Sequence, residues 1–475
     1  MTLLEIIALL IGFSAIGGLF NHRILKLPHT IGLVVFALAA SGVVLAIEHV
    51  NPGLGIQKTI AGALGEIDFQ KAVLEGMLCA LLFAGAAHVD LTELAERKWS
   101  IGLMATVGVT LSTFIVGGAI WALAKGLGFN LPFIWALVFG ALISPTDPVA
   151  VLSILKTVRV PRLLQAKIAG ESLLNDGVGV VVFSILVVIA TGGAGHHGVG
   201  GSETIGAAQI AALFAQEALG GAALGFVAGL IAYWMMRAID EHNIEVMITI
   251  ALVTGVYAIA LRLHASGPIA VVVAGLFIGN HGARFAMSAK TRQHVFQFWE
   301  LTDEILNSVL FLLIGLEVLV VTFSPEHMGL AAMAIPVVLV ARLIAVSVPI
   351  NFLRQFESFE TGAIRILTWA GLRGGISVAL ALSLPNNEFK PAILTMTYFV
   401  VVFSIIVQGM TVEKLVSSII KEARDDPSRP LAATAEEIEA ASRATAAITP
   451  ENAPELIDKG GKRAQRRARG KGNKD

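Results

Sequence analysis

Two acidic stretches lie inside otherwise apolar parts of the chain and hold the residues best able to do chemistry. They are Ile143-Ser-Pro-Thr-Asp-Pro148 and Glu171-Ser-Leu-Leu-Asn-Asp-Gly177. A carboxylate near the centre of a bilayer costs roughly 2.5–3.5 kcal/mol on insertion scales, so chains keep such groups mainly where ions or protons move. Together the two stretches predict a transport site within the membrane.

The first stretch predicts an interrupted helix. Pro145 and Pro148 flank Thr146 and Asp147, and each proline removes a backbone donor and clashes with the preceding turn. Broken backbone at membrane depth is tolerated where it is buried in protein or lines a watery cavity, and its freed carbonyl groups can bind a cation. The alternative is a simple proline kink with an incidental aspartate.

The second stretch places four polar side chains on one helical stripe. Glu171 and Asn175 are four residues apart, as are Ser172 and Asp176, so each pair shares a face. Asp176 and the Ser172 hydroxyl are hard oxygen ligands of the kind that alkali cations prefer. Asp176 can instead carry a proton, and competition between the two ions for one carboxylate is sufficient for exchange. The alternative is a polar cluster that only joins helices.

A third segment, Trp369-Ala-Gly-Leu-Arg-Gly-Gly-Ile-Ser377, places Arg373 near mid-membrane among glycines that weaken the helix. A buried guanidinium needs an acidic partner. We expect this partner to be Glu171, which leaves Asp176 free to titrate; Asp147 or Asp176 is the alternative partner.

Two further charges lie in apolar segments. They are Arg342 and Glu317, and we expect Glu317 to be interfacial rather than part of the site.

Composition defines the fold class. Hydrophobic residues make up 55% of the 475 residues and charged residues 15%, against about 25% charged in soluble domains. The sequence therefore predicts an all-α polytopic membrane protein, with no nucleic-acid partner and no cofactor. About thirteen spans are expected, near 3–20, 31–47, 73–87, 101–123, 134–155, 163–190, 210–236, 244–263, 269–280, 305–323, 330–350, 363–384 and 392–410.

The distribution of basic residues predicts orientation. One set of alternate loops carries about fourteen Lys and Arg residues and the other about five, which places the N-terminus outside and the C-terminus in the cytoplasm. We expect a transmembrane domain over 1–415 and a cytoplasmic, largely disordered basic tail over 416–475.

Two interrupted helices in opposite halves of the chain, one broken by proline and one by glycine, are typical of inverted repeats that cross at a central site. The fourth to sixth and the eleventh to thirteenth expected spans would be the related units. This expectation rests on spacing and on the two breaks.

Four motifs, in this order, resemble the monovalent cation:proton antiporter 1 family, and within it the NhaP-type prokaryotic sodium/proton antiporters. They are Thr146-Asp147-Pro148, Glu171-Ser-x-x-Asn-Asp176, Phe311-x-Leu-Ile-Gly-Leu-Glu317 and Gly371-Leu-Arg-Gly374. The resemblance implies an NhaA/NhaP-like antiporter fold and a homodimer with an elevator-like motion. It also implies core helices over about 73–190 and 305–410 and dimerisation helices over about 1–50 and 205–281.

The resemblance also implies residue roles. Asp176 would be the titrating ligand of Na⁺, with Ser172 and Thr146 as oxygen ligands, Asn175 and Asp147 as helpers at the crossing, and Glu171 with Arg373 as a structural ion pair. One departure is Leu82-Phe-Ala-Gly85, which is apolar where relatives often carry a polar or acidic residue.

The expected function is electroneutral exchange of one Na⁺ or Li⁺ for one H⁺, because Asn175 cannot titrate and only Asp176 would exchange charge. A K⁺/H⁺ antiporter of the same family is an alternative. Less favoured are a cation channel, which usually forms its pore by ringed symmetry, and a hydrolase using Asp147 and Asp176 as an acid/base dyad. The chain is thus not expected to be an enzyme.

Overall fold

The computed structural model describes residues 3–51, 55, 62, 72–96, 98–147, 151, 162–192, 207–320, 325–356, 359 and 362–425. Among these residues all regular secondary structure is helical, as expected for a membrane chain whose backbone groups must be paired within each segment. The expected basic tail lies almost entirely outside the described residues. Contacts divide the chain into a main unit, residues 1–358 and 362–416, and a second unit, residues 359–361 and 417–475.

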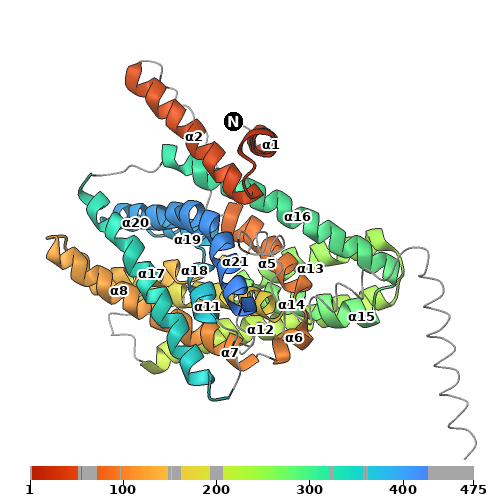
Figure 1. Ribbon diagram of the computed structural model, residues 1–475. Coiled ribbons are helices and arrows are strands. Elements are labelled where there is room, and N and C mark those ends of the chain that lie inside the picture. The colour runs from red at the N-terminus through yellow and green to blue at the C-terminus, as the bar shows by residue number, and fades with distance from the viewer. Residues whose placement is uncertain are drawn as a thin grey trace, which may run out of the picture. The chain divides into compact units, whose positions relative to one another are not determined.

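Figure 1 shows the helices coloured in chain order from the N-terminus to the C-terminus. In chain order they are α1 (Leu3–Phe20), η1 (Asn21–Leu25), α2 (His29–Val50), η2 (Ala72–Met77), α5 (Leu78–His88), α6 (Leu91–Glu96), α7 (Lys98–Leu103), η3 (Met104–Gly108), α8 (Val109–Gly126), α9 (Phe133–Ile143), α11 (Arg162–Ala190), α12 (Ala207–Arg237), α13 (His242–Arg262), α14 (Gly267–Phe277), η4 (Ile278–Gly282), α15 (Ala283–Phe285), α16 (Ala289–Leu316), η5 (Glu317–Leu319), α17 (Pro325–Leu353), α18 (Ala363–Trp369), α19 (Gly375–Leu382), α20 (Lys390–Phe403), η6 (Ser404–Gln408) and α21 (Gly409–Asp425).

Nine helices in the described part of the chain are long and apolar enough to cross a membrane, and each coincides with an expected span. The ninth expected span, which is short in sequence, belongs to a continuous segment of 19 residues from Gly267 to Phe285. The chain is therefore an integral membrane protein with an all-helical fold. The total of thirteen spans is not confirmed.

The four remaining expected spans take other forms. The span at 73–87 is a π-helical turn followed by the 11-residue α5, and the span at 305–323 is the second half of the 28-residue α16. The span at 134–155 breaks after α9, and the span at 363–384 is divided into α18 and α19. Two of the four are thus the interrupted helices that the sequence predicts.

Helices α5, α12, α13 and α14 share one apolar core, which also receives Leu173 of α11. Small residues bring the backbones close, as in membrane helix packing generally. A Cβ atom on Gly225 of α12 would lie 2.0 Å from the carbonyl oxygen of Ala270, and one on Gly279 would lie 2.1 Å from that of Ala87. Helix α5 thus packs against α14, one of the helices expected to mediate dimerisation, and also against α16.

Helix α16 connects distant parts of the main unit and is the long helix running from α2 to α13 in Figure 1. Near its start, the Trp299 indole donates to Thr249 Oγ1 of α13 at 3.0 Å. Near its end, Gly315 packs against Ala37 of α2. Glu317, expected at the membrane interface, follows directly and is buried with 5% exposure.

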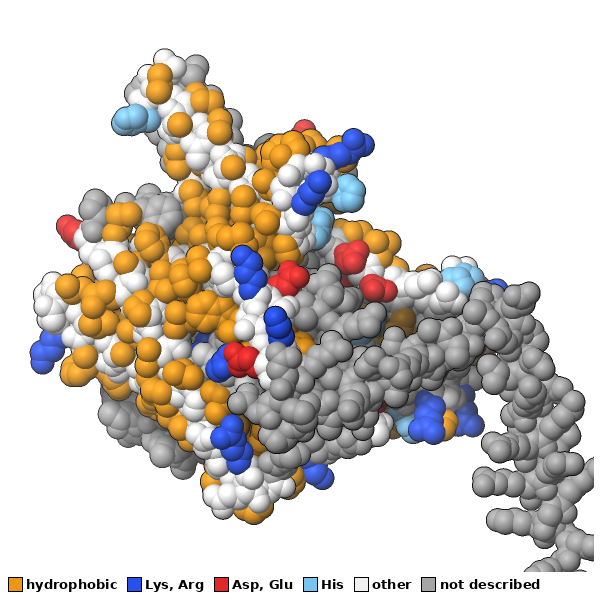
Figure 2. Space-filling model, in the orientation of Figure 1, with side chains coloured by type: hydrophobic (Ala, Val, Ile, Leu, Met, Phe, Trp, Pro, Cys, Tyr) orange, Lys and Arg blue, Asp and Glu red, His pale blue; other side chains and the backbone are white. Residues whose placement is uncertain are grey.

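Helices α8 and α17 pack together and present large apolar side chains outward. The left part of the face in Figure 2 is accordingly dominated by hydrophobic side chains, with charges at its margins. These exposed residues include Phe114, Trp121, Val340, Val348 and Phe352. Such a surface suits contact with lipid rather than with water.

Candidate cation site at the helix crossing

The two interrupted helices meet at their breaks. Helix α9 ends at Ile143, and residues 144–147 are non-helical; α18 ends at Trp369, and α19 begins only at Gly375. The backbone N–H of Asp147 donates to the carbonyl oxygen of Leu372 at 2.8 Å. The crossing predicted from proline and glycine positions is confirmed, although Pro148 lies outside the described residues.

Glycines allow this close approach. A Cβ atom on Gly374 would lie 2.0 Å from Asp147 Oδ2, and one on Gly179 of α11 would lie 2.3 Å from Pro145 Cγ. Both distances are far below van der Waals contact, so no larger residue fits without displacing its neighbour. The glycines let α19 and α11 press against the break of α9.

Helix α11 contributes the polar stripe beside the break. Thr146 Oγ1 and Ser172 Oγ are hydrogen bonded at 2.9 Å, and Asn175 Nδ2 donates to Thr146 Oγ1 at 2.8 Å. The backbone N–H of Thr146 donates to Asn175 Oδ1 at 3.2 Å. Asn175 therefore uses both the oxygen and the nitrogen of its side-chain amide to hold the non-helical segment after α9 against α11.

Asp176 lies one turn after Ser172 on the same face of α11 and has an unsatisfied oxygen. The residue is 4% exposed, and its Oδ1 is buried without a hydrogen-bond partner. A buried carboxylate oxygen left unpaired is costly, so it calls for an ion or a proton that completes it. The neighbouring hydroxyl and carboxylate oxygens are of the type that coordinates a small hard cation.

Glu171 forms its ion pair with a different arginine from the one expected. Arg342 Nη1 of α17 lies 2.5 Å from Glu171 Oε1, while Arg342 Nε and Nη2 donate to the carbonyl oxygen of Leu367. This corrects the pairing of Glu171 with Arg373. The physical reason is that α17 packs along α18 and presents Arg342 at the buried end of the stripe.

Arg373 instead binds backbone at the break. Its Nη1 donates to the carbonyl oxygens of Ser144 and Pro145, the latter at 2.7 Å, and its own N–H donates to Ser404 Oγ at 2.9 Å. The end of α9 leaves carbonyl groups without helical partners, and the guanidinium satisfies two of them. Arg373 thus fixes the crossing and makes no ion pair with an acid among the described residues.

Several serines support the site, although nothing in the sequence marks them. Ser144 Oγ bonds to the carbonyl oxygen of Gly140 at 2.6 Å and to Ser112 Oγ of α8 at 2.9 Å. Ser404 accepts from Arg373, as described above. Isolated serines in apolar helices give no spacing signal, so only the fold identifies them.

The donor set fits a monovalent cation better than a multivalent one. Among the described residues no three His, Cys, Asp or Glu side chains are grouped for a metal. The apolar Leu82 and Phe83 of α5 are buried and add no oxygen ligand. The site is thus built from one unpaired carboxyl, hydroxyl groups and an amide at a backbone break.

Comparison with known proteins agrees with this geometry. Residues 11–418 match the family described as sodium/hydrogen exchanger, transmembrane. The chain belongs to this family. It is a family of transporters.

Individual relatives cover nearly the whole transmembrane part. The chain is 46% identical to the Na⁺/H⁺ antiporter NhaP of Pseudomonas aeruginosa over 88% of this chain and 97% of that protein. It is 34% identical to the Na⁺/H⁺ antiporter NhaH of Halobacillus dabanensis over 84% and 93%. The sodium proton antiporter MjNhaP1 of Methanocaldococcus jannaschii shares the fold, with a TM-score of 0.67 and 18% identity over 88% of this chain and 99% of that one.

Proposed function

We propose that this sodium/hydrogen exchanger family member exchanges Na⁺ for H⁺ across the membrane, using Asp176 as the shared site. The observation that carries the proposal is the buried Oδ1 of Asp176 without a partner, one helical turn from Ser172, whose hydroxyl is hydrogen bonded to Thr146 at the broken-helix crossing. The relatives named as Na⁺/H⁺ antiporters, NhaP and NhaH, support sodium as the cation. The crossing is the arrangement in which secondary transporters place their ions.

Exchange follows from competition. The ionised Asp176 carboxylate binds one cation with help from the Ser172 and Thr146 oxygens, and protonation removes the charge that the cation needs. A site that carries either ion but never both, and that opens alternately to the two sides, couples the two fluxes. Each side chain has a distinct part: Asn175 and Asp147 hold the crossing, and Arg373 closes the end of α9.

We infer a one-to-one, electroneutral stoichiometry. Asn175 cannot titrate, and Glu171 is held by Arg342 at 2.5 Å, so Asp176 is the one acid of the α11 stripe left to exchange a proton. When one monovalent cation enters and one proton leaves, no net charge crosses the membrane. The absence of a sodium-induced membrane potential in sealed proteoliposomes tests this stoichiometry.

We also propose an orientation in the membrane and an assembly. The distribution of Lys and Arg supports an extracellular N-terminus and a cytoplasmic C-terminus. We propose a homodimer within the cell membrane that contributes to pH homeostasis. Cysteine labelling from each side tests the orientation, and the mass of the detergent-purified complex against 50.0 kDa per chain tests the dimer.

The decisive experiment measures proton flux. Proteoliposomes that contain the full chain and have an acidic interior are given Na⁺, Li⁺ or K⁺ in turn on the outside. Na⁺ or Li⁺ is expected to dissipate the gradient, and the Asp176→Asn protein is expected to match empty liposomes. A gradient that responds only to K⁺ would assign the alternative K⁺/H⁺ exchange, and conductance without coupled proton movement would indicate a channel.

A further inference from the structure

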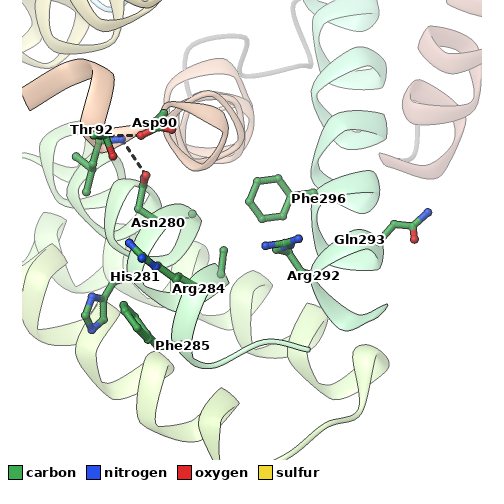
Figure 3. Close-up of a pocket in the computed structure, with 12 residues that line it drawn as sticks. Asp90, Thr92, Asn280, His281, Arg284, Phe285, Arg292, Gln293 and Phe296 are labelled. Atoms are coloured by element: carbon green, nitrogen blue, oxygen red, sulfur yellow. Dashed lines mark hydrogen bonds between the residues drawn. The ribbon is translucent and has the colours of Figure 1, made fainter. Parts of the chain in front are cut away.

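An open cavity of about 760 Å³ lies away from the transport site, between the end of α5, the η4–α15 segment and the start of α16 (Figure 3). Its volume falls in the usual range of ligand sites, about 300–1,000 Å³. The polar residues that line it are Asp90, Thr92, Asn280, His281, Arg284, Arg292 and Gln293. No step of the proposed exchange uses these residues.

The wall of the cavity is held in place by a hydrogen-bonded asparagine. Asn280 Oδ1 accepts from the N–H of Leu91 at 2.8 Å, and Nδ2 donates to the carbonyl oxygens of Val89 and Leu276, both at 2.9 Å. Asp90 Oδ1 accepts from the N–H of Thr92 at 2.7 Å. These bonds join the α5–α6 turn to η4, so the cavity is built before any ligand arrives.

Two guanidinium groups contribute the dominant charge. Arg284 stands on the side of Asn280 and His281, and Arg292 stands across from it beside Phe296 (Figure 3). Within the described part of the chain neither arginine has an ion pair with an acid, and the one acid in the lining, Asp90, is engaged with the Thr92 N–H. The two fixed positive charges outnumber the single carboxylate charge of Asp90, so the lining disfavours a vestibule for cations and favours an anion.

We propose that this cavity binds a phosphate-bearing anion through Arg284 and Arg292. Guanidinium groups donate paired hydrogen bonds to phosphate oxygens in a geometry that fits them closely. Phe285 stands beside Arg284, with the guanidinium carbon 5.4 Å from its ring centre, and is 54% exposed. The cavity also lies at the end of the apolar segment from Gly267 to Phe285, where a helix that crosses the membrane would reach the lipid headgroups.

The phosphate can come from an anionic lipid headgroup or from a soluble ion, and one experiment separates them. The purified full chain in neutral detergent is titrated with phosphatidylglycerol, with phosphatidylcholine of equal chain length, and with inorganic phosphate. Bound lipid is counted by native mass spectrometry and bound phosphate by equilibrium dialysis. The test variant is Arg284→Ala/Arg292→Ala, and the matched control is Arg237→Ala/Arg354→Ala, which removes two exposed arginines outside the cavity.

The proposal expects the test variant to weaken binding by roughly 100-fold, since each charge-assisted hydrogen bond contributes on the order of tenfold. The control should bind as the wild type does. Preferential binding of phosphatidylglycerol assigns a lipid headgroup, whereas binding of inorganic phosphate alone assigns a soluble ion. Wild-type protein that binds neither ligand, or equal binding by the test variant, overturns the site. Unchanged proton flux in the test variant shows that it is folded.

Discussion

The two acidic ends of the α11 stripe have opposite environments. Glu171 is 1% exposed and sits against the Arg342 guanidinium, whose other nitrogens hold the carbonyl oxygen of Leu367. Asp176, five residues later, is 4% exposed, and its Oδ1 has no partner. The two side chains are thus almost equally buried, but Glu171 has a guanidinium partner and Asp176 Oδ1 has no hydrogen-bond partner.

This contrast shows that burial alone does not identify a transport residue. A carboxylate locked in a buried ion pair cannot exchange ions without exposing the partner charge, which costs several kcal/mol. A carboxyl oxygen that has no hydrogen-bond partner can accept a cation or a proton in turn. We therefore propose that the Glu171 end is structural and that the Asp176 end carries the transported ions.

The largest expected effect comes from neutralising the transport end. Asp176→Asn should abolish sodium-driven proton flux in proteoliposomes, because the amide can neither hold the proton nor supply the charge that binds Na⁺. Thermal unfolding in detergent should stay close to that of the wild type, since no ion pair is broken. Glu245→Gln, which changes another fully buried carboxyl, is the matched control and should retain exchange.

Breaking the structural end should instead destabilise the fold. Arg342→Met leaves Glu171 buried without its partner, and a loss of about 3–5 kcal/mol in unfolding free energy is expected. The double variant Glu171→Gln/Arg342→Met should recover much of this loss. If the single and double variants unfold alike, the pair does not couple, and the contrast between the two ends is lost.

The crossing itself offers an intermediate effect. Gly374→Ala places a Cβ atom against Asp147, and overpacking of this kind costs typically about 1–3 kcal/mol. Exchange should fall together with the midpoint of thermal unfolding. Gly118→Ala on α8, where a Cβ atom meets no neighbour within 4 Å, is the control and should leave both quantities unchanged or slightly improved.

The smallest effect is expected at Arg373. Arg373→Lys keeps the charge but loses the planar fork that reaches the carbonyl oxygens of Ser144 and Pro145. A decrease of about tenfold in apparent Na⁺ affinity is expected, similar to the loss of a supporting contact at other metal sites. Full retention of affinity would show that the guanidinium does not position the break.

Sequence reasoning succeeded where local chemistry decides the structure. Pro145 predicted the break of α9, the glycines around Arg373 predicted the gap between α18 and α19, and the four-residue spacing placed the polar groups of α11 on one stripe. The nine long apolar helices also coincide with expected spans. Each of these features depends on residues within a few positions of one another.

Sequence reasoning failed where two helices distant in the chain must choose each other. Both Arg342 and Arg373 were visible as membrane arginines, but spacing cannot tell which one reaches Glu171. The packing of α17 beside α18 decides it, and the unpaired carbonyl groups of α9 give Arg373 a different partner.

Competition at one carboxyl is the central claim, and the pH dependence of the half-saturating Na⁺ concentration tests it most directly. Exchange is measured in proteoliposomes across a series of pH values at many Na⁺ concentrations. If one proton and one Na⁺ exclude each other at Asp176, the half-saturating concentration should rise about tenfold per unit fall in pH at the acidic end, while the maximal rate at saturating Na⁺ stays constant. A half-saturating concentration that does not change with pH would contradict the claim, because the two ions would then bind at separate groups.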